Sequence, residues 1–185
     1  KPPPPAEQQD FVGRGEELVE RGLIALQRGR VDEALAWMHR ADDSAHSDGE
    51  RAHARGWLAV TLCANGEPSA ALDVAASLAE LDAGTYLDGA VGATAEGFAF
   101  FQLQQRPEGE RAFAKALALV DGTGDRLSQA VLRLAYGHAL DGLGDEGAGE
   151  VLADARARLD AMGGPATGWD TAYSLAASAS ARATR

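Results

Sequence analysis

Residues 27–34 read QRGRVDEA, a short polar turn around a glycine that joins two stretches with the apolar spacing of amphipathic helices. Three similar turns follow, at residues 64–71 (ANGEPSAA), 104–109 (QQRPEG) and 143–149 (LGDEGAG). Their spacing is 37, 38 and 40 residues when they are aligned on Gly29, Gly66, Gln104 and Gly144. A period of this length predicts an array of helical repeats, each a pair of helices joined by one such turn.

The composition of the 185-residue chain favours helices over strands. Ala and Leu make up about a third of the residues, whereas Ile occurs once and aromatic side chains amount to 6%. Ala and Leu are strong helix formers, and sheets favour β-branched and aromatic residues. After the first turn, Val31, Ala34, Leu35 and Met38 follow the spacing of a helix with one buried face. The sequence therefore predicts an all-α protein.

We expect a single domain over residues 10–182, preceded by a tail. Pro2–Pro5 favour an extended conformation, so residues 1–9 are interpreted as a Pro-rich linker or tail. The predicted hairpins cover residues 10–45, 49–82, 87–121 and 126–162. A further helix over residues 168–181 is expected to cap the apolar face of the last hairpin.

The small residues of these hairpins resemble the pattern of the tetratricopeptide repeat (TPR) family. In the first unit, Gly22 lies midway along the first helix, Gly29 lies in the turn, and Ala34 and Ala41 flank Met38 in the second helix. Small residues let two helices cross closely. The period here is longer than the family's usual 34 or so residues. The resemblance implies a right-handed solenoid of about four TPR-like hairpins plus the capping helix.

The resemblance also implies a groove, because the first helices of TPR hairpins line a concave face that binds a protein or peptide. The groove positions implied in this way are His53, Val60, Thr94, Phe98, Phe101, Gln102, Leu134, His138 and Asp141, with Glu16, Val19 and Leu23 in the first unit. Phe98 and Phe101 either anchor a peptide in this groove or fill the core between hairpins. The sequence leaves both interpretations open.

Charge and cysteine content exclude several partner classes. The formal net charge is −11, which argues against nucleic acid and anionic membrane surfaces and favours basic or neutral protein partners. Cys63 is the single cysteine, so it has no internal disulfide partner and is interpreted as a small buried residue. No apolar run is long enough to span a membrane, and a cytoplasmic location is the default expectation.

No motif in the sequence organises a catalytic or metal site. His39, His46 and His53 are seven residues apart, whereas zinc ligands on one helix are three or four apart. Residues 121–125 (DGTGD) look like the start of a calcium loop, but Arg126 stands where that loop needs glycine. We therefore expect no enzymatic activity, no metal and no cofactor.

These observations point to a non-catalytic protein- or peptide-binding module, part of a larger regulatory or signalling protein. Two alternatives stay open. One is a ligand-sensing regulatory domain that takes a small molecule into the concave groove near Phe98 and His138. The other is a self-associating scaffold, a homodimer formed through Trp169, Tyr173 and Leu175 of the C-terminal helix.

Overall fold

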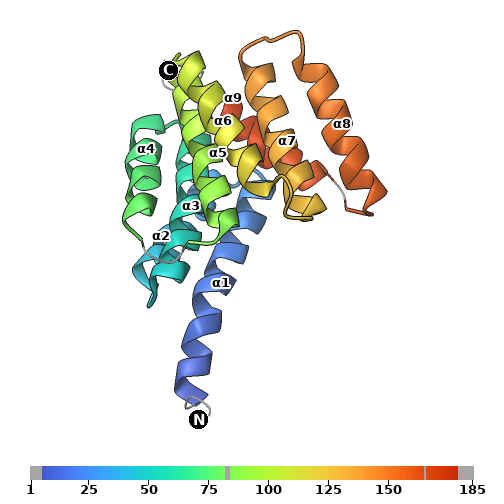
Figure 1. The fold of residues 1–185 in the computed structure, drawn as a ribbon. Coiled ribbons are helices and arrows are strands. Elements are labelled where there is room, and N and C mark those ends of the chain that lie inside the picture. Colours follow the sequence, from blue (N-terminus) through green and yellow to red (C-terminus); the bar gives the residue numbers. More distant parts are fainter. Residues whose placement is uncertain (1–5, 82–83, 165, 179–185) are drawn as a thin grey trace.

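The computed structural model describes residues 6–81, 84–164 and 166–178, with side chains from Gly15 onward. These residues form nine α-helices and a short 3-10 turn at Leu78–Glu80, with no strand among them (Figure 1). The helices are, in chain order, α1 (Ala6–Gln27), α2 (Val31–Asp43), α3 (Asp48–Asn65), α4 (Pro68–Ser77), α5 (Tyr86–Gln102), α6 (Arg106–Val120), α7 (Arg126–Gly142), α8 (Ala148–Ala161) and α9 (Thr167–Ser178). The all-α prediction is confirmed.

The first eight helices pack in consecutive pairs: α1 with α2, α3 with α4, α5 with α6 and α7 with α8. The four aligned turn positions share one backbone conformation. Gly29, Gly66 and Gly144 have φ angles of 73°, 82° and 70°, and Gln104 has a φ angle of 61°. This left-handed conformation is strained for a residue with a Cβ, so Gln104 adopts it only because the turn requires it.

The chain becomes helical earlier than the sequence interpretation allowed. Helix α1 begins at Ala6, whereas the Pro-rich tail was expected to reach residue 9. The physical reason is that Ala6 and Glu7 are good helix formers and follow proline, a residue suited to a helix start. Residues 1–5 of the expected tail and residues 179–182 of the expected domain lie outside the described residues.

Glycines in the first helices allow each pair to pack closely. An ideal Cβ on Gly22 would lie 2.7 Å from Met38, and one on Gly97 would lie 2.6 Å from the ring of Phe113. The same position in the last pair is Gly137, where a Cβ would lie 2.8 Å from Leu152. In all three pairs a large apolar side chain of the second helix fills the space that a side chain on the first helix would need.

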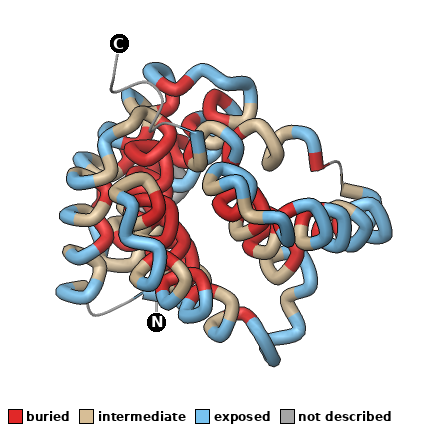
Figure 2. Tube along the Cα trace, turned by 90° about the horizontal axis from the view of Figure 1, so that it is seen from above, coloured by how far each residue is buried: buried red, intermediate tan, exposed pale blue. Residues whose placement is uncertain are grey.

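Helix α9 packs on α7 of the last pair, as a capping helix would, and reaches beyond that pair to α1, α3 and α5. Figure 1 shows it at the back of the view between α6 and α7, and Figure 2 shows the buried residues gathered on the inner sides of the bundle. Helix α7 has its main contacts outside its own pair with α9, and only minor ones with α5 and α6. The buried residues Ala172, Tyr173 and Ala176 of α9 belong to the same core cluster as those of the first helices. Helix α9 therefore fastens the last pair to the other three.

The close approach at Gly97 predicts opposite effects of the same substitution at two helical glycines. Gly97→Ala should lower the free energy of unfolding by about 1–3 kcal/mol, because the added Cβ would lie 2.6 Å from the buried ring of Phe113 and force it to shift. Gly149→Ala in α8 is the matched control, since nothing lies within 4 Å of its ideal Cβ. It should leave stability unchanged or raise it by up to about 1 kcal/mol. Urea unfolding measures both, and a Gly97→Ala protein as stable as the control would contradict the packing described.

Candidate functional site

Six of the nine expected groove residues are buried. Their exposed fractions lie between 0% and 7%, and they are Val60, Thr94, Phe98, Phe101, Leu134 and His138. Phe101 packs on Phe113 with ring centroids 5.7 Å apart, and Phe98 stacks on Tyr173 of α9 at 5.9 Å. The expectation that these side chains are exposed is therefore corrected. Phe98 and Phe101 take the second of the two roles that the sequence left open, because they fill the core between helices. Of the other three, Asp141 is exposed, and Gln102 and His53 are partly exposed.

Cys63 is fully buried, in agreement with its interpretation as a small core residue. Its Sγ lies 3.5 Å from the carbonyl oxygen of Ala95, and burial raises the pKa of the thiol.

The residues expected to mediate self-association point into the molecule. Tyr173 is 1% exposed, and its burial raises the pKa of the phenol. Trp169 stacks on Tyr173 at 5.8 Å and on Trp57 of α3 at 5.7 Å, while Leu175 is half-buried. The apolar face of α9 is thus used within the chain.

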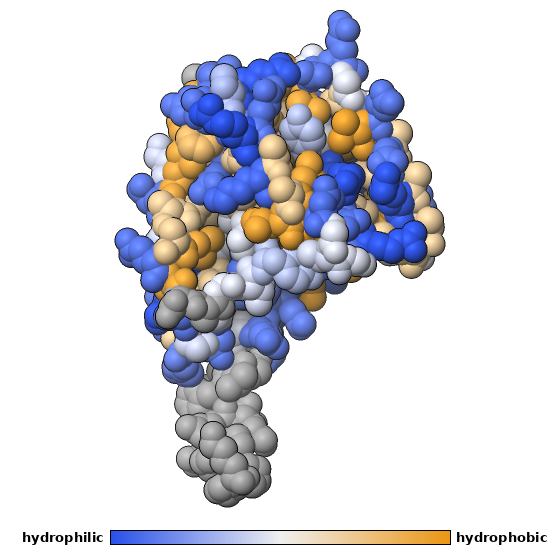
Figure 3. Space-filling model, in the orientation of Figure 1, coloured by the Kyte–Doolittle hydropathy of each residue, from blue (hydrophilic) through white to orange (hydrophobic). Residues whose placement is uncertain are grey.

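The exposed large apolar side chains of the described residues are scattered over several elements, namely Ile24, Tyr86, Leu127 and Met162. On the face drawn in Figure 3, apolar residues likewise lie in separate small groups between hydrophilic ones.

A polar cluster anchors the start of α9. Asp170 accepts hydrogen bonds from Arg156 of α8 at 2.8 Å and lies 2.8 Å from Nε2 of His138 on α7. Burial alone would raise the pKa of Asp170, but the hydrogen bonds from Arg156 and His138 outweigh it and lower the pKa. This cluster ties α9 to both helices of the last pair. The expected groove residue His138 therefore serves to hold α9.

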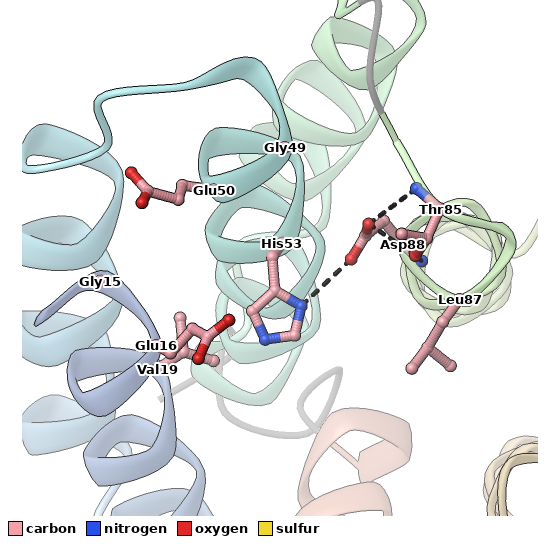
Figure 4. A pocket seen from close by; sticks show the side chains of 9 residues that line it. All are labelled: Gly15, Glu16, Val19, Gly49, Glu50, His53, Thr85, Leu87 and Asp88. Atoms are coloured by element: carbon pink, nitrogen blue, oxygen red, sulfur yellow. Dashed lines mark hydrogen bonds and ion pairs between the residues drawn. The ribbon is translucent and has the colours of Figure 1, made fainter. Parts of the chain in front are cut away.

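A cavity of about 280 Å³ remains open between the N-terminal parts of α3 and α5 and the middle of α1 (Figure 4). Its lining combines three carboxylates, one imidazole and apolar or small residues, namely Gly15, Glu16, Val19, Gly49, Glu50, His53, Thr85, Leu87 and Asp88. His53 precedes Trp57 by about one turn of α3, and Leu87 precedes Phe98 by about three turns of α5. Since Trp57 and Phe98 contact α9, the cavity is on the side of the first helices that α9 partly covers.

The capping box of α5 positions the buried carboxylate of this cavity. Thr85 Oγ1 accepts a hydrogen bond from the Asp88 amide at 3.2 Å, and Asp88 Oδ2 accepts one from the Thr85 amide at 2.9 Å. Asp88 Oδ1 lies 3.1 Å from Nδ1 of His53 (Figure 4). Burial would raise the pKa of Asp88, but the hydrogen bonds from His53 and Thr85 outweigh it and lower the pKa. The pair thus holds His53 with its other ring nitrogen directed into the cavity.

The two remaining carboxylates, Glu50 and Glu16, differ in whether the backbone donates a hydrogen bond to them. Glu50 Oε2 accepts a hydrogen bond from the His46 amide at 2.8 Å. Glu16 is exposed, and Figure 4 shows its carboxylate beside the ring of His53. Among the described residues, no three histidine, cysteine or acidic side chains converge as a metal ligand set. The arrangement can instead accept hydrogen bonds from a cationic group.

Sequence reasoning identified His53, Glu16 and Val19 but missed the other lining residues, above all Asp88. A signal was present: Ser47-x-x-Glu50 and Thr85-x-x-Asp88 both have the form of a helix-start capping box. Such boxes locate the beginnings of α3 and α5, where the cavity lies.

Comparisons with family models, curated proteins and solved structures find no match to this chain. Within residues 6–81, 84–164 and 166–178, no helix combines the length and apolar character needed to cross a membrane.

The lowered pKa of Asp88 predicts a specific pH dependence of stability. Because the folded state lowers this pKa, ionised Asp88 stabilises the fold above its unfolded pKa of about 3.9, and this contribution is lost as the pH falls through the folded value. Asp88→Asn should therefore be less stable than the original chain at pH 6 and should lose less stability on acidification. Urea unfolding at pH 6 and pH 3 measures both effects. Asp73→Asn, on the exposed side of α4, should keep the original slope, and an unchanged slope in Asp88→Asn would contradict the assignment.

Proposed function

We propose that this chain is a TPR-like interaction module that binds a basic segment of a protein partner at the cavity between α1, α3 and α5. The observation that carries the proposal is the lining itself. Three first helices each contribute a carboxylate, Glu16, Glu50 and Asp88, to one open cavity on the side where the implied groove lies. The rest of that side is covered by α9.

The repeat architecture supports the finer description of the fold. Four consecutive helix pairs, four turns with left-handed backbone and three glycines at equivalent crossings are the features of a stacked repeat array. We infer a right-handed solenoid of about four TPR-like hairpins in which α9 lies along the concave side. Preformed repeats offer a binding surface at low ordering cost, which suits the recognition of an extended or helical peptide.

The chemistry of the cavity favours a lysine or arginine side chain. Val19 and Leu87 provide apolar surface for an aliphatic stem, and Glu16 and Glu50 are within reach of a cationic head group. The formal net charge of −11 steers a basic partner toward the chain. Binding here needs no catalysis, so the proposal agrees with the expectation of a non-enzymatic module.

A small cationic ligand is the second candidate, because the cavity volume of about 280 Å³ is near the lower end of small-molecule sites. This alternative moves the ligand-sensing site away from Phe98 and His138. The void beside Phe98 measures only about 40 Å³. A sensing role predicts that a simple alkylamine, such as butylamine, raises the melting temperature of the chain.

A peptide series tests the proposed function. Short labelled peptides that differ only in a central Lys, Arg, Gln or Glu should bind in the order Arg or Lys, then Gln, then Glu. Glu16→Gln should weaken binding of the Lys peptide by about two- to fivefold, the effect of one exposed ion pair, and added salt should weaken it further. Fluorescence anisotropy measures each affinity.

Glu146→Gln is the matched control, since Glu146 is exposed in the connection between α7 and α8, away from the cavity lining. Equal affinity for the Lys and Gln peptides, or an equal effect of both substitutions, would contradict the proposal. Stabilisation by butylamine without any peptide binding would favour the small-ligand candidate.

A further inference from the structure

We propose that α9 is a displaceable occupant of the face formed by α1, α3, α5 and α7, and that an amphipathic helix of a partner protein takes its place. The partner helix carries the same pattern of side chains as α9. An aromatic residue is followed directly by an acidic residue, and a second aromatic residue and an alanine lie four and seven positions after the first aromatic residue. In α9 these are Trp169, Asp170, Tyr173 and Ala176. The inference is independent of the cavity and does not rest on the basic-segment proposal.

Helix α9 packs on the four first helices as a bound amphipathic helix packs in a groove, with one side buried and the other exposed. Its buried residues are Ala172, Tyr173 and Ala176, which recur at helical spacing on one side, while Ser174 and Ser178 on the other side are exposed. Helix α9 is 12 residues long, a length at which isolated helices are marginal in water. Its helical state therefore depends on the face that receives it.

Three polar side chains of the receiving face keep a hydrogen bond within that face when α9 is absent. Thr61 Oγ1 donates to the carbonyl of Trp57 at 2.8 Å, and Thr94 Oγ1 donates to the carbonyl of Ala90 at 2.8 Å. The Gln102 amide, which donates to the Ala176 carbonyl of α9, also donates to the carbonyl of Cys63 at 2.9 Å. Departure of α9 therefore leaves an apolar groove floored by Trp57 and Phe98, which a second helix can cover.

The polar anchor makes the seat selective. Asp170 meets Arg156 and His138 at one end of the groove, so an incoming helix needs a carboxylate at that position. Since α9 is also the main link between α7 and the rest of the bundle, its exchange frees the last pair to change position.

A disulfide between α9 and α7 tests whether α9 can be displaced, because the disulfide holds α9 in place. An ideal Cβ on Gly142 of α7 lies 3.3 Å from the Cβ of Ala177 and 3.1 Å from its carbonyl oxygen, so a shift of a few tenths of an ångström brings the pair to the separation of about 3.5–4.5 Å found in disulfides. The full chain carrying Gly142→Cys and Ala177→Cys is titrated with a labelled peptide of residues 166–178. We expect the reduced chain to bind the peptide, the oxidised chain to bind it at least tenfold more weakly, and reductant to restore binding.

A second variant weakens the binding of α9 to its own chain, while the added peptide keeps the original sequence. Asp170→Asn in the full chain should raise peptide affinity about three- to tenfold, because the competing α9 loses its ion pair with Arg156. Asp160→Asn, on an exposed position of α8, should leave affinity unchanged. A peptide with Tyr173→Ala should bind neither chain.

The inference is overturned if neither the reduced chain nor Asp170→Asn binds the peptide, or if the oxidised chain binds as well as the reduced one. Hydrogen exchange on the original chain gives a readout that needs no substitution. Amides of α9 should exchange at least tenfold faster than those in the middle of α3 and α5. Equal protection of all three helices would make α9 a fixed part of the core and would also overturn the proposal.

Discussion

A continuous column of aromatic rings holds the helices of this protein in register. Trp57 of α3 stacks on Trp169 of α9, Trp169 stacks on Tyr173, and Tyr173 stacks on Phe98 of α5, with successive centroids 5.7, 5.8 and 5.9 Å apart. Phe98 in turn meets Phe113 of α6 edge to face at 5.3 Å. Aromatic pairs of this kind contribute about 0.5–1.5 kcal/mol each beyond the burial of their surface. Because the column passes through α9, the position of that helix decides how the pairs sit against one another.

Most of the helical architecture was predictable from sequence because its causes are local. The turn spacing, the apolar stripes and the small residues at helix crossings each depend on a few neighbouring residues. Gln104, which the spacing aligned with three turn glycines, shares their left-handed backbone. The place of α9 was not predictable in this way. Its sequence shows one apolar side but does not say which surface that side will cover. The same limit applies to Phe98, whose burial depends on Tyr173, a residue 75 positions later in the chain.

The candidate site shows the same division between local and long-range causes. The N-cap Ser47 of α3 and the capping box of α5 are readable in the sequence, and they fix where Glu50 and Asp88 stand. That Asp88 meets His53, and that both border the cavity with Glu16, depends on how three helices far apart in sequence pack together. A pattern within one helix carries no information about that packing.

The electrostatics of the cavity at first sight favour an anion, because the starts of two helices carry partial positive charge. The chain itself uses the amide donors there. Asp88 accepts from the Thr85 amide, Ser47 accepts from the Glu50 amide, and Glu50 accepts from the His46 amide. Ser47 and the two acidic side chains thus already accept from those donors, and Glu16 adds a further carboxylate to the lining. The helix starts therefore do not argue against the cationic group that we propose for this cavity.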